Sequence, residues 1–116
     1  MLKFIEYPKC STCKKAKKYL DELGLEHSDR HIVEERLNKE ELFSLYQKSG
    51  LPLKRFFNTS GLKYKELQLK DKLPTMSEDE QLELLASDGM LVKRPIVETE
   101  NQVLVGFKAE QYDSLK

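Results

Sequence analysis

Near the start of the chain, the apolar positions change from a strand-like to a helix-like spacing. Residues 2–6 (LKFIE) predict a short strand, and Pro8 ends it because proline has no N–H to donate to a neighbouring strand. In residues 11–23 the apolar positions recur every three or four residues, which predicts a helix, and Gly24 is typical of its end. Residues 25–33 have the content of a second strand, although they alternate poorly. This order predicts a unit whose two strands are parallel.

The middle of the chain is predicted to be helical. Residues 38–50 and 77–87 each begin with a capping box, in which Asn or Ser is followed three residues later by Glu. Gly50 is expected to end the first of these helices and Gly89 to follow the second. Between them, residues 51–76 contain short apolar runs separated by turn residues, which predict short helices joined by turns.

After this helical block the chain returns to strand-like content. Residues 90–98 (MLVKRPIVE) and 101–107 (NQVLVGF) predict two strands, and the polar stretch ETEN between them suits a tight hairpin. The residues from Lys108 onward are expected to form a short helix. The whole pattern predicts an α/β fold with a small mixed sheet, in which a helical block interrupts the strands.

Length and composition favour one domain, residues 1–116, with a modest core. The chain has 20 Lys and Arg against 20 Asp and Glu, so a surface built to coat nucleic acid is not expected. No apolar run approaches the roughly 18 residues of a membrane span, and the first ten residues do not resemble a signal peptide. We therefore expect the protein to lie in the cytoplasm, a compartment that keeps ordinary thiols reduced.

The two cysteines, Cys10 and Cys13, are the only ones in the chain and form a C-x-x-C pair at the predicted start of a helix. Unpaired N–H groups at a helix start favour a negative charge, and Lys9 and Lys14 flank the pair, so we expect Cys10 to ionise readily. Cys13 shares the apolar face of the helix and is expected to be the more buried thiol. An exposed attacking thiol over a buried one suits thiol–disulfide exchange. The six lysines in residues 1–20, against one Glu, favour anionic partners.

Three other interpretations of the cysteine pair remain open. Cys10, Cys13, His27 and His31 are spaced C-x2-C-x13-H-x3-H, which lies in the range of zinc fingers. However, two histidines four residues apart on a strand would be roughly 13 Å from each other, too far for one ion. The thiols could also be small buried hydrophobic groups. A permanent disulfide would close a very small ring in a reducing compartment and is least favoured.

The chain resembles the ArsC/Spx/YffB family of thioredoxin-fold proteins. The resemblance extends over nearly the whole chain and depends on YPKCSTCKKAKKYL (7–20), KRFFNTSGLKYKEL (54–67) and SEDEQLELLASDGMLVKRPIVE (77–98). It implies that Cys10 is the nucleophile, that Cys13 is the second cysteine of a dithiol–disulfide cycle, and that Arg94 stabilises the thiolate or a bound oxyanion. It also implies that Pro95 is a cis-proline facing Cys10.

For substrate binding, the resemblance points to Ser11 and Thr12 between the cysteines, and to Asn58 and Lys108. Arsenate-reducing members that use glutathione carry three arginines around the oxyanion, and only Arg94 matches one of them. Asn58 lies where a second arginine is expected, and Lys108 lies near the third position. Lysine attracts an anion but cannot form the forked pair of hydrogen bonds that arginine forms.

Two functions are therefore expected. The first is a thiol–disulfide oxidoreductase that holds no cofactor or metal, acts on a small oxyanion or a disulfide, and is re-reduced by thioredoxin or glutathione. The alternative, implied by the Spx branch, is a redox-switched transcriptional regulator that binds RNA polymerase. Neither function implies direct contact with nucleic acid or a membrane.

Overall fold

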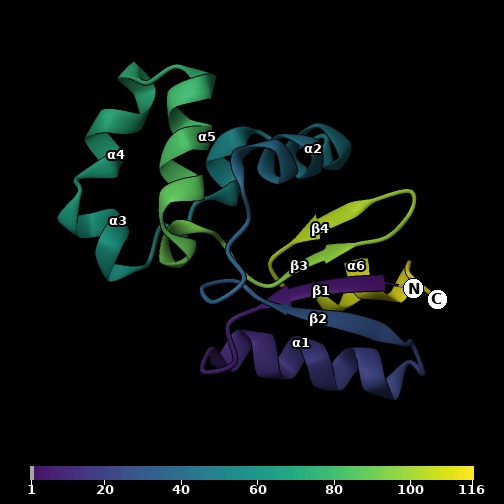
Figure 1. Cartoon of the computed structure of the whole chain (residues 1–116). Helices are drawn as coiled ribbons and strands as arrows, with labels where there is room; N and C mark the ends of the chain where they lie inside the picture. Colours follow the sequence, from purple (N-terminus) through teal and green to yellow (C-terminus); the bar gives the residue numbers. More distant parts are fainter. Residues whose placement is uncertain (1) are drawn as a thin grey trace.

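A sheet with the strand order β2-β1-β3-β4 organises one half of the molecule (Figure 1). The computed structural model of the protein describes residues 2–116. β1 pairs with β2 in parallel, whereas β1 with β3 and β3 with β4 are antiparallel. The strands are β1 (Leu2–Glu6), β2 (His27–His31), β3 (Ile96–Glu98) and β4 (Val103–Val105).

Most of the helical residues precede β3 in the chain. The helix α1 connects the two parallel strands, and α6 follows the last strand. A helical block lies between β2 and β3, to the upper left of the sheet in Figure 1. The helices are α1 (Ser11–Glu22), α2 (Lys39–Ser49), α3 (Leu62–Glu66), α4 (Leu69–Lys72), α5 (Glu78–Ser87) and α6 (Ala109–Asp113), with 3-10 turns η1 (Leu53–Phe56), η2 (Leu73–Thr75) and η3 (Gly89–Leu91).

The predicted α/β fold, with a mixed sheet and a helical insertion, is confirmed. Both capping boxes are present, on Asn38 of α2 and on Ser77 of α5. The strand expected over residues 90–98 is much shorter, because η3 occupies its start and β3 begins only after Pro95. α5 ends at Ser87 and Gly89 follows it, as expected, although Gly89 is not the residue that caps the helix. Asp88 is already extended, and Gly89 begins η3 instead.

The core is divided between the two faces of the sheet. On one face, α1 buries Ala16 and Leu20 against Phe4 of β1, and Tyr112 of α6 completes this cluster. Successive side chains of a strand point to opposite faces, so Ile5 lies on the other face. There it packs with β3, β4 and the helical block in the larger of the two clusters. The helical block is therefore attached to the sheet through apolar contacts.

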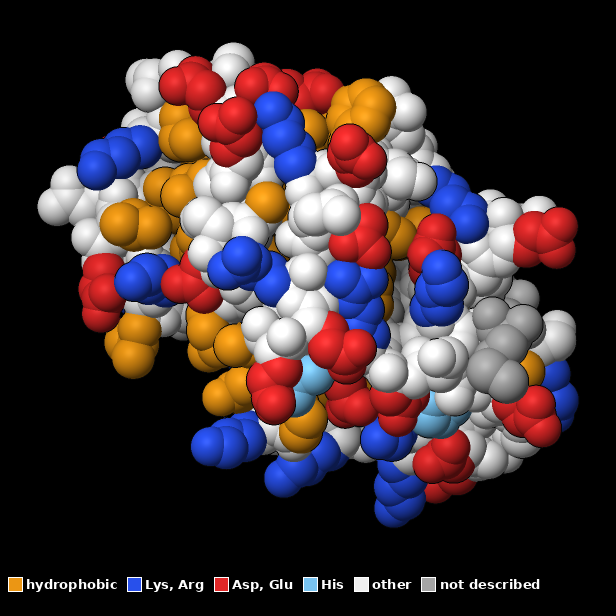
Figure 2. All heavy atoms as spheres, viewed as in Figure 1, with side chains coloured by type: hydrophobic (Ala, Val, Ile, Leu, Met, Phe, Trp, Pro, Cys, Tyr) orange, Lys and Arg blue, Asp and Glu red, His pale blue; other side chains and the backbone are white. Residues whose placement is uncertain are grey.

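Charged side chains of both signs cover much of the surface. On the face shown in Figure 2, Lys and Arg gather at the lower left, over the start of α1, whereas hydrophobic side chains reach the surface mainly over the helical block. Within residues 2–116, no helix is long and apolar enough to cross a membrane.

Candidate active site

The register of the sheet brings two distant segments together. β1 and β3 are antiparallel, with Ile5 opposite Ile96. The chain that leaves β1 therefore runs beside the chain that enters β3. The first of these segments carries Cys10 and the second carries Arg94. Residues 84 positions apart thus meet at one edge of the sheet.

Cys10 is the N-cap residue of α1. Its backbone is extended (φ −80°, ψ 123°), and its N–H donates to the carbonyl oxygen of Tyr7 over 2.9 Å, which closes the turn between β1 and α1. The backbone N–H of Cys13 donates to the sulfur of Cys10 over 3.4 Å. The thiol thus takes the place of the Ser or Asp oxygen that usually caps a helix, and its sulfur faces the otherwise unpaired N–H groups of the first turn.

Arg94 is held beside this sulfur by contacts on two sides. Its guanidinium carbon lies 5.2 Å from the centre of the Tyr7 ring, and its Nη1 donates to the carbonyl oxygen of Met90 over 3.4 Å. The Arg94 side chain also lies close enough to the Cys10 sulfur to lower the pKa of that thiol. The peptide bond between Arg94 and Pro95 is cis, as the resemblance implied.

The helical block supplies the third segment of the site. Within this block, the residue that follows η1 pairs with the residue that follows η3, through an isolated antiparallel bridge between Phe57 and Val92. On either side of this bridge, Asn58 N–H donates to the carbonyl of Leu91 over 2.7 Å, and Lys93 N–H donates to the carbonyl of Phe56 over 2.8 Å. The bridge therefore fixes the segment that begins at Asn58 beside Lys93 and Arg94.

The turn after β4 supplies the fourth segment. Gly106 N–H donates to the carbonyl of Pro95 over 2.8 Å, and Gly106 C=O accepts from the hydroxyl of Tyr112 over 3.2 Å. These two bonds anchor Gly106 and Phe107 next to the cis-proline.

Together, the four segments enclose a cavity of about 340 Å³ beside the half-buried Cys10. Its wall contains two cations and several neutral polar groups, and no carboxylate contributes to the part formed by residues 2–116. The wall consists of Cys10, Thr12, Asn58, Ser60, Gly61, Lys93, Arg94, Gly106 and Phe107. Such a wall suits an anionic or polar ligand placed against the sulfur.

The environment of Cys10 lowers its pKa from the ordinary value of 9.0. Partial burial opposes ionisation, but hydrogen bonds outweigh it: from the backbone and side chain of Cys13, from the Arg94 side chain, and from the backbone of Thr12. Lys9 and Lys14, which we expected to contribute, are exposed and are not among the groups that lower the pKa. The thiolate is thus stabilised by hydrogen-bond donors rather than by flanking lysines.

Cys13 has the opposite environment. It is fully buried on the apolar face of α1, and this burial is the largest cause that raises its pKa, to about 12. A hydrogen bond with Cys10 and the negative charge of Cys10 raise it further, whereas the charge of Arg94 acts in the other direction. Two thiols one helical turn apart therefore differ by at least about three pKa units.

Some of the predicted substrate-binding residues lie in the cavity wall and others do not. Thr12 and Asn58 line the cavity. Ser11 is exposed at the first position of α1, and Pro95 is buried; neither is part of the wall. Lys108 is exposed at the N-cap of α6 and is also outside the wall, so the expected lysine is not in the cavity.

The cation that does line the cavity beside Arg94 is Lys93, which was not expected from the sequence. Ser60 and Gly61 were missed as well. The signal available for Lys93 was its place next to Arg94 in the KRP motif. Ser60 and Gly61 had none, because only the bridge at Phe57 brings them to Cys10.

The two histidines lie on β2, and the ring of each is paired with a carboxylate. His27 Nε2 is 3.0 Å from Asp21, and His31 Nε2 is 3.2 Å from Glu34. In residues 2–116, no three His, Cys, Asp or Glu side chains are grouped so that they could hold a metal ion. The zinc-like spacing of cysteines and histidines in the sequence therefore does not become a cluster in space.

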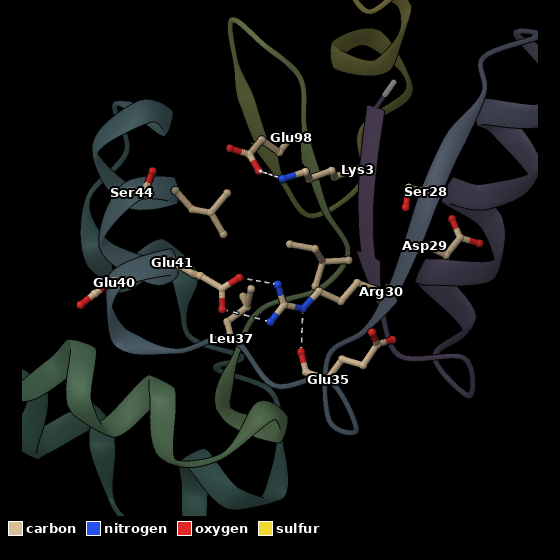
Figure 3. A pocket seen from close by; sticks show the side chains of 12 residues that line it. Lys3, Ser28, Asp29, Arg30, Glu35, Leu37, Glu40, Glu41, Ser44 and Glu98 are labelled. Atoms are coloured by element: carbon tan, nitrogen blue, oxygen red, sulfur yellow. Dashed lines mark hydrogen bonds and ion pairs between the residues drawn. The ribbon is translucent and has the colours of Figure 1, made fainter.

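A larger cavity, of about 680 Å³, lies elsewhere, between β2 and α2 (Figure 3). Neither cysteine is in its wall. Arg30 reaches across it from β2, hydrogen-bonds both carboxylate oxygens of Glu41 on α2, and donates from Nε to the Glu35 carbonyl over 2.7 Å. Lys3 and Glu98 pair at 4.0 Å. These charged groups pair with one another, and the pair of Arg30 with Glu41 links the sheet to α2. The smaller cavity, which contains Cys10, is therefore the candidate site.

Comparison with known proteins agrees with this geometry. The sequence profile described as the ArsC family matches residues 5–115. The chain belongs to the ArsC family. The family prediction made from the sequence is thus confirmed, and with it the thioredoxin-like fold, because the solved relatives share it.

Among curated proteins, the chain is 62% identical to the uncharacterized protein YusI of Bacillus subtilis (strain 168) over 112 residues, which cover 97% of this chain and 95% of YusI. It is 30% identical to the global transcriptional regulator Spx of Enterococcus faecalis over 112 residues, 96% of this chain and 83% of Spx. Among solved structures, an ArsC family related protein from Bacteroides fragilis has a TM-score of 0.97 at 56% identity, covering 99% and 97% of the two chains. The arsenate reductase from Vibrio cholerae has a TM-score of 0.88 at 28% identity, covering 99% and 97%.

Proposed function

We propose that the protein is a thiol–disulfide oxidoreductase that cycles between a Cys10/Cys13 dithiol and a disulfide. The single observation that supports this most is the asymmetry of the two thiols. The accessible one, Cys10, has a lowered pKa, and the buried one, Cys13, has a raised pKa. This is the arrangement that attack followed by resolution requires.

In the first step, the Cys10 thiolate attacks one sulfur of an oxidised disulfide. The new bond joins Cys10 to that sulfur, the old S–S bond breaks, and the leaving thiolate takes up a proton. In the second step, Cys13 loses its proton and attacks the Cys10 sulfur, which releases the second thiol and leaves the Cys10–Cys13 disulfide. Two electrons have then passed to the substrate.

The second step is assisted by the first. The charge of Cys10 and its hydrogen bond are among the causes that raise the pKa of Cys13. Both disappear once Cys10 is part of a mixed disulfide, while the lowering effect of the Arg94 charge remains. The resolving thiol therefore ionises more easily at the stage at which it must attack.

In this scheme, Arg94 stabilises the Cys10 thiolate by a charge-assisted hydrogen bond, and Thr12 and Asn58 offer polar groups to the substrate. No bound cofactor is required, because an external dithiol or thiol, of the thioredoxin or glutathione type, returns two electrons to the disulfide. The same cavity could take a small oxyanion such as arsenate, although Arg94 is the one arginine that residues 2–116 contribute to its wall.

A coupled assay tests this function. The oxidation of NADPH is followed with 2-hydroxyethyl disulfide or arsenate as substrate, once with thioredoxin and its reductase and once with glutathione and its reductase. We expect turnover above the rate without the protein, and its loss in Cys10→Ser. Cys13→Ser is expected to lose the thioredoxin-supported rate, because the mixed disulfide is not resolved within the chain. Absence of turnover with both substrates and both reductants contradicts the proposal.

A second candidate is a redox-switched transcriptional regulator that binds RNA polymerase, and the similarity to Spx over 96% of the chain favours it. In that case the Cys10–Cys13 pair would control a contact rather than turn over substrate. Retention of RNA polymerase subunits on the immobilised protein, dependent on its oxidation state and without NADPH turnover, would support the regulator. Turnover without retention would support the enzyme.

A further inference from the structure

We propose that Lys93 forms a binding site for an anionic group, a carboxylate in the simplest case, on the molecule whose sulfur or carbon reacts with Cys10. As a statement about natural substrates this rests on the proposed thiol–disulfide function, and it narrows the substrates to small disulfides or thiol adducts that carry a carboxylate near the reacting atom. The site itself depends only on the position and charge of Lys93.

The backbone of Lys93 is fixed by the isolated bridge between Phe57 and Val92. Its N–H donates to the carbonyl of Phe56 over 2.8 Å, next to the pairing of Phe57 with Val92. The side chain leaves this fixed point and enters the cavity wall. Its position therefore follows from the tertiary structure rather than from a flexible surface loop.

The Lys93 side chain lies close to Gly106, which is also part of the cavity wall. A Cβ atom at Gly106 would lie 3.7 Å from Lys93 Cε, and Gly106 has a φ of +84°, which side-chain-bearing residues rarely adopt. The end of the aliphatic part of Lys93 thus lies beside Gly106 at the cavity wall, and no side chain at position 106 covers it. Long cationic side chains commonly bury their stem in this way while the charge stays in water.

The charge of Lys93 is not neutralised within the protein. Among the ion pairs formed in residues 2–116, none includes Lys93. The cavity wall contains no carboxylate from those residues either, and its neighbours there, Asn58 and Ser60, are neutral. A cation in this setting is available to an anionic ligand.

Arg94 does not compete for this role, because its guanidinium already has partners. It lies over the Tyr7 ring, donates to the Met90 carbonyl and lowers the pKa of the Cys10 thiol. The two neighbouring cations therefore have separate tasks: Arg94 acts on the attacking sulfur, and Lys93 acts on the incoming molecule. An ammonium is a compact charge with three donors, which suits one carboxylate.

The separate roles of Lys93 and Arg94 can be tested with iodoacetate and iodoacetamide. These two reagents differ only in whether a carboxylate or a neutral amide adjoins the reacting carbon. With either reagent the Cys10 thiolate forms an S–C bond and iodide leaves. The second-order rate constant at Cys10 is measured for both reagents at low ionic strength, by mass spectrometry of the Cys10 peptide. The ratio of the two constants cancels any change in the amount or reactivity of the thiolate.

We expect Lys93→Gln to lower the iodoacetate-to-iodoacetamide ratio about fivefold, the effect of one partly exposed charge pair. Lys93→Arg should restore most of the ratio. Lys15→Gln is the matched control, because it removes the same charge from an exposed position on α1 outside the cavity wall. The ratio should stay at the wild-type value in that variant.

Three results would overturn the proposal. The first is an unchanged ratio in Lys93→Gln. The second is an equal fall in Lys15→Gln, which would mean that the general positive field of the surface attracts the reagent. The third is a fall in Lys108→Gln alone, which would return the anion site to the lysine favoured by the sequence. Alkylation of Cys10 needs no catalytic turnover. If Lys93→Gln lowers the ratio as expected but the protein shows no NADPH-linked turnover, the proposed function is contradicted and the anion site at Lys93 is still supported.

Discussion

The two thiols should differ strongly in their rate of reaction with a disulfide at about pH 7. Cys13 has a pKa of about 12 and Cys10 one below 9.0, so the thiolate fraction of Cys10 is at least about a thousandfold higher. The thiolate of Cys13, once formed, is the better nucleophile because it is more basic. With a Brønsted slope of about 0.4–0.5, three pKa units make it about 20- to 30-fold more reactive per thiolate, which offsets part of the difference in thiolate fraction. Cys10 should therefore react at least about thirtyfold faster, before the full burial of Cys13 widens the difference.

The measurement uses 2,2′-dithiodipyridine and the absorbance of the released pyridine-2-thione. Cys13→Ser should release one equivalent quickly and remain as a mixed disulfide. The wild-type protein should release two equivalents, because Cys13 attacks the mixed disulfide and closes the Cys10–Cys13 bond. Cys10→Ser should release one equivalent much more slowly than Cys13→Ser, because burial, the largest cause that raises the pKa of Cys13, remains in that variant. The difference on ionisation alone is smaller than in the wild type, since the charge of Cys10 no longer raises the pKa of Cys13. In concentrated guanidinium chloride the two single variants should react alike, since the difference originates in the folded state.

The expected asymmetry is refuted if Cys10→Ser reacts within a few fold of Cys13→Ser under native conditions. Release of a single equivalent by the wild-type protein would contradict the resolving role of Cys13 specifically, because it would show that the mixed disulfide persists beside a free thiol.

Two further predictions concern the stability of the fold. A Cβ at Gly89 would lie 2.1 Å from the backbone oxygen of Ile32, and backbone cannot rotate away, so Gly89→Ala should cost about 3 kcal/mol, the upper part of the range for overpacking. For 116 residues this lowers Tm by about 12 °C, measurable by calorimetry. Burial lowers the pKa of His27, but Asp21 and Asp29 outweigh it and raise the pKa above 6.5. This stabilisation is complete below pH 6.5 and is lost as the pH rises through the folded-state pKa, so urea midpoints of the wild type should fall there relative to those of His27→Gln.

The stability predictions for Gly89 and His27 each have a control in the same chain. Gly50 has a φ of +69°, and a Cβ atom there would meet no heavy atom within 4 Å, so Gly50→Ala carries backbone strain alone, about 1 kcal/mol. Equal losses in the glycine variants would show that the contact of Gly89 with Ile32 has no special cost. For His27, an unchanged pH dependence in His27→Gln would remove the histidine as its source.

Local patterns in the sequence were enough to predict the helices and the reactive pair. The capping boxes at Asn38 and Ser77, and the thiol at the start of α1, depend on groups three or four residues apart, which interact whatever the rest of the chain does. The difference in burial between Cys10 and Cys13 follows from the same helical period. The resemblance to the ArsC family added Arg94 and the cis-proline at Pro95, which the structure contains.

The sequence by itself therefore determined the helices, the C-x-x-C pair and the family, whereas the tertiary structure decided which side chains surround Cys10. Lys93 rather than Lys108 lines the cavity because the pairing of Phe57 with Val92 turns that segment toward the site. Gly89 is required by its approach to Ile32, which is 57 residues away, and not by the helix that precedes it. These contacts depend on long-range strand register and chain closure, whose free energy is set by packing across the whole molecule and leaves no periodic trace in the local sequence.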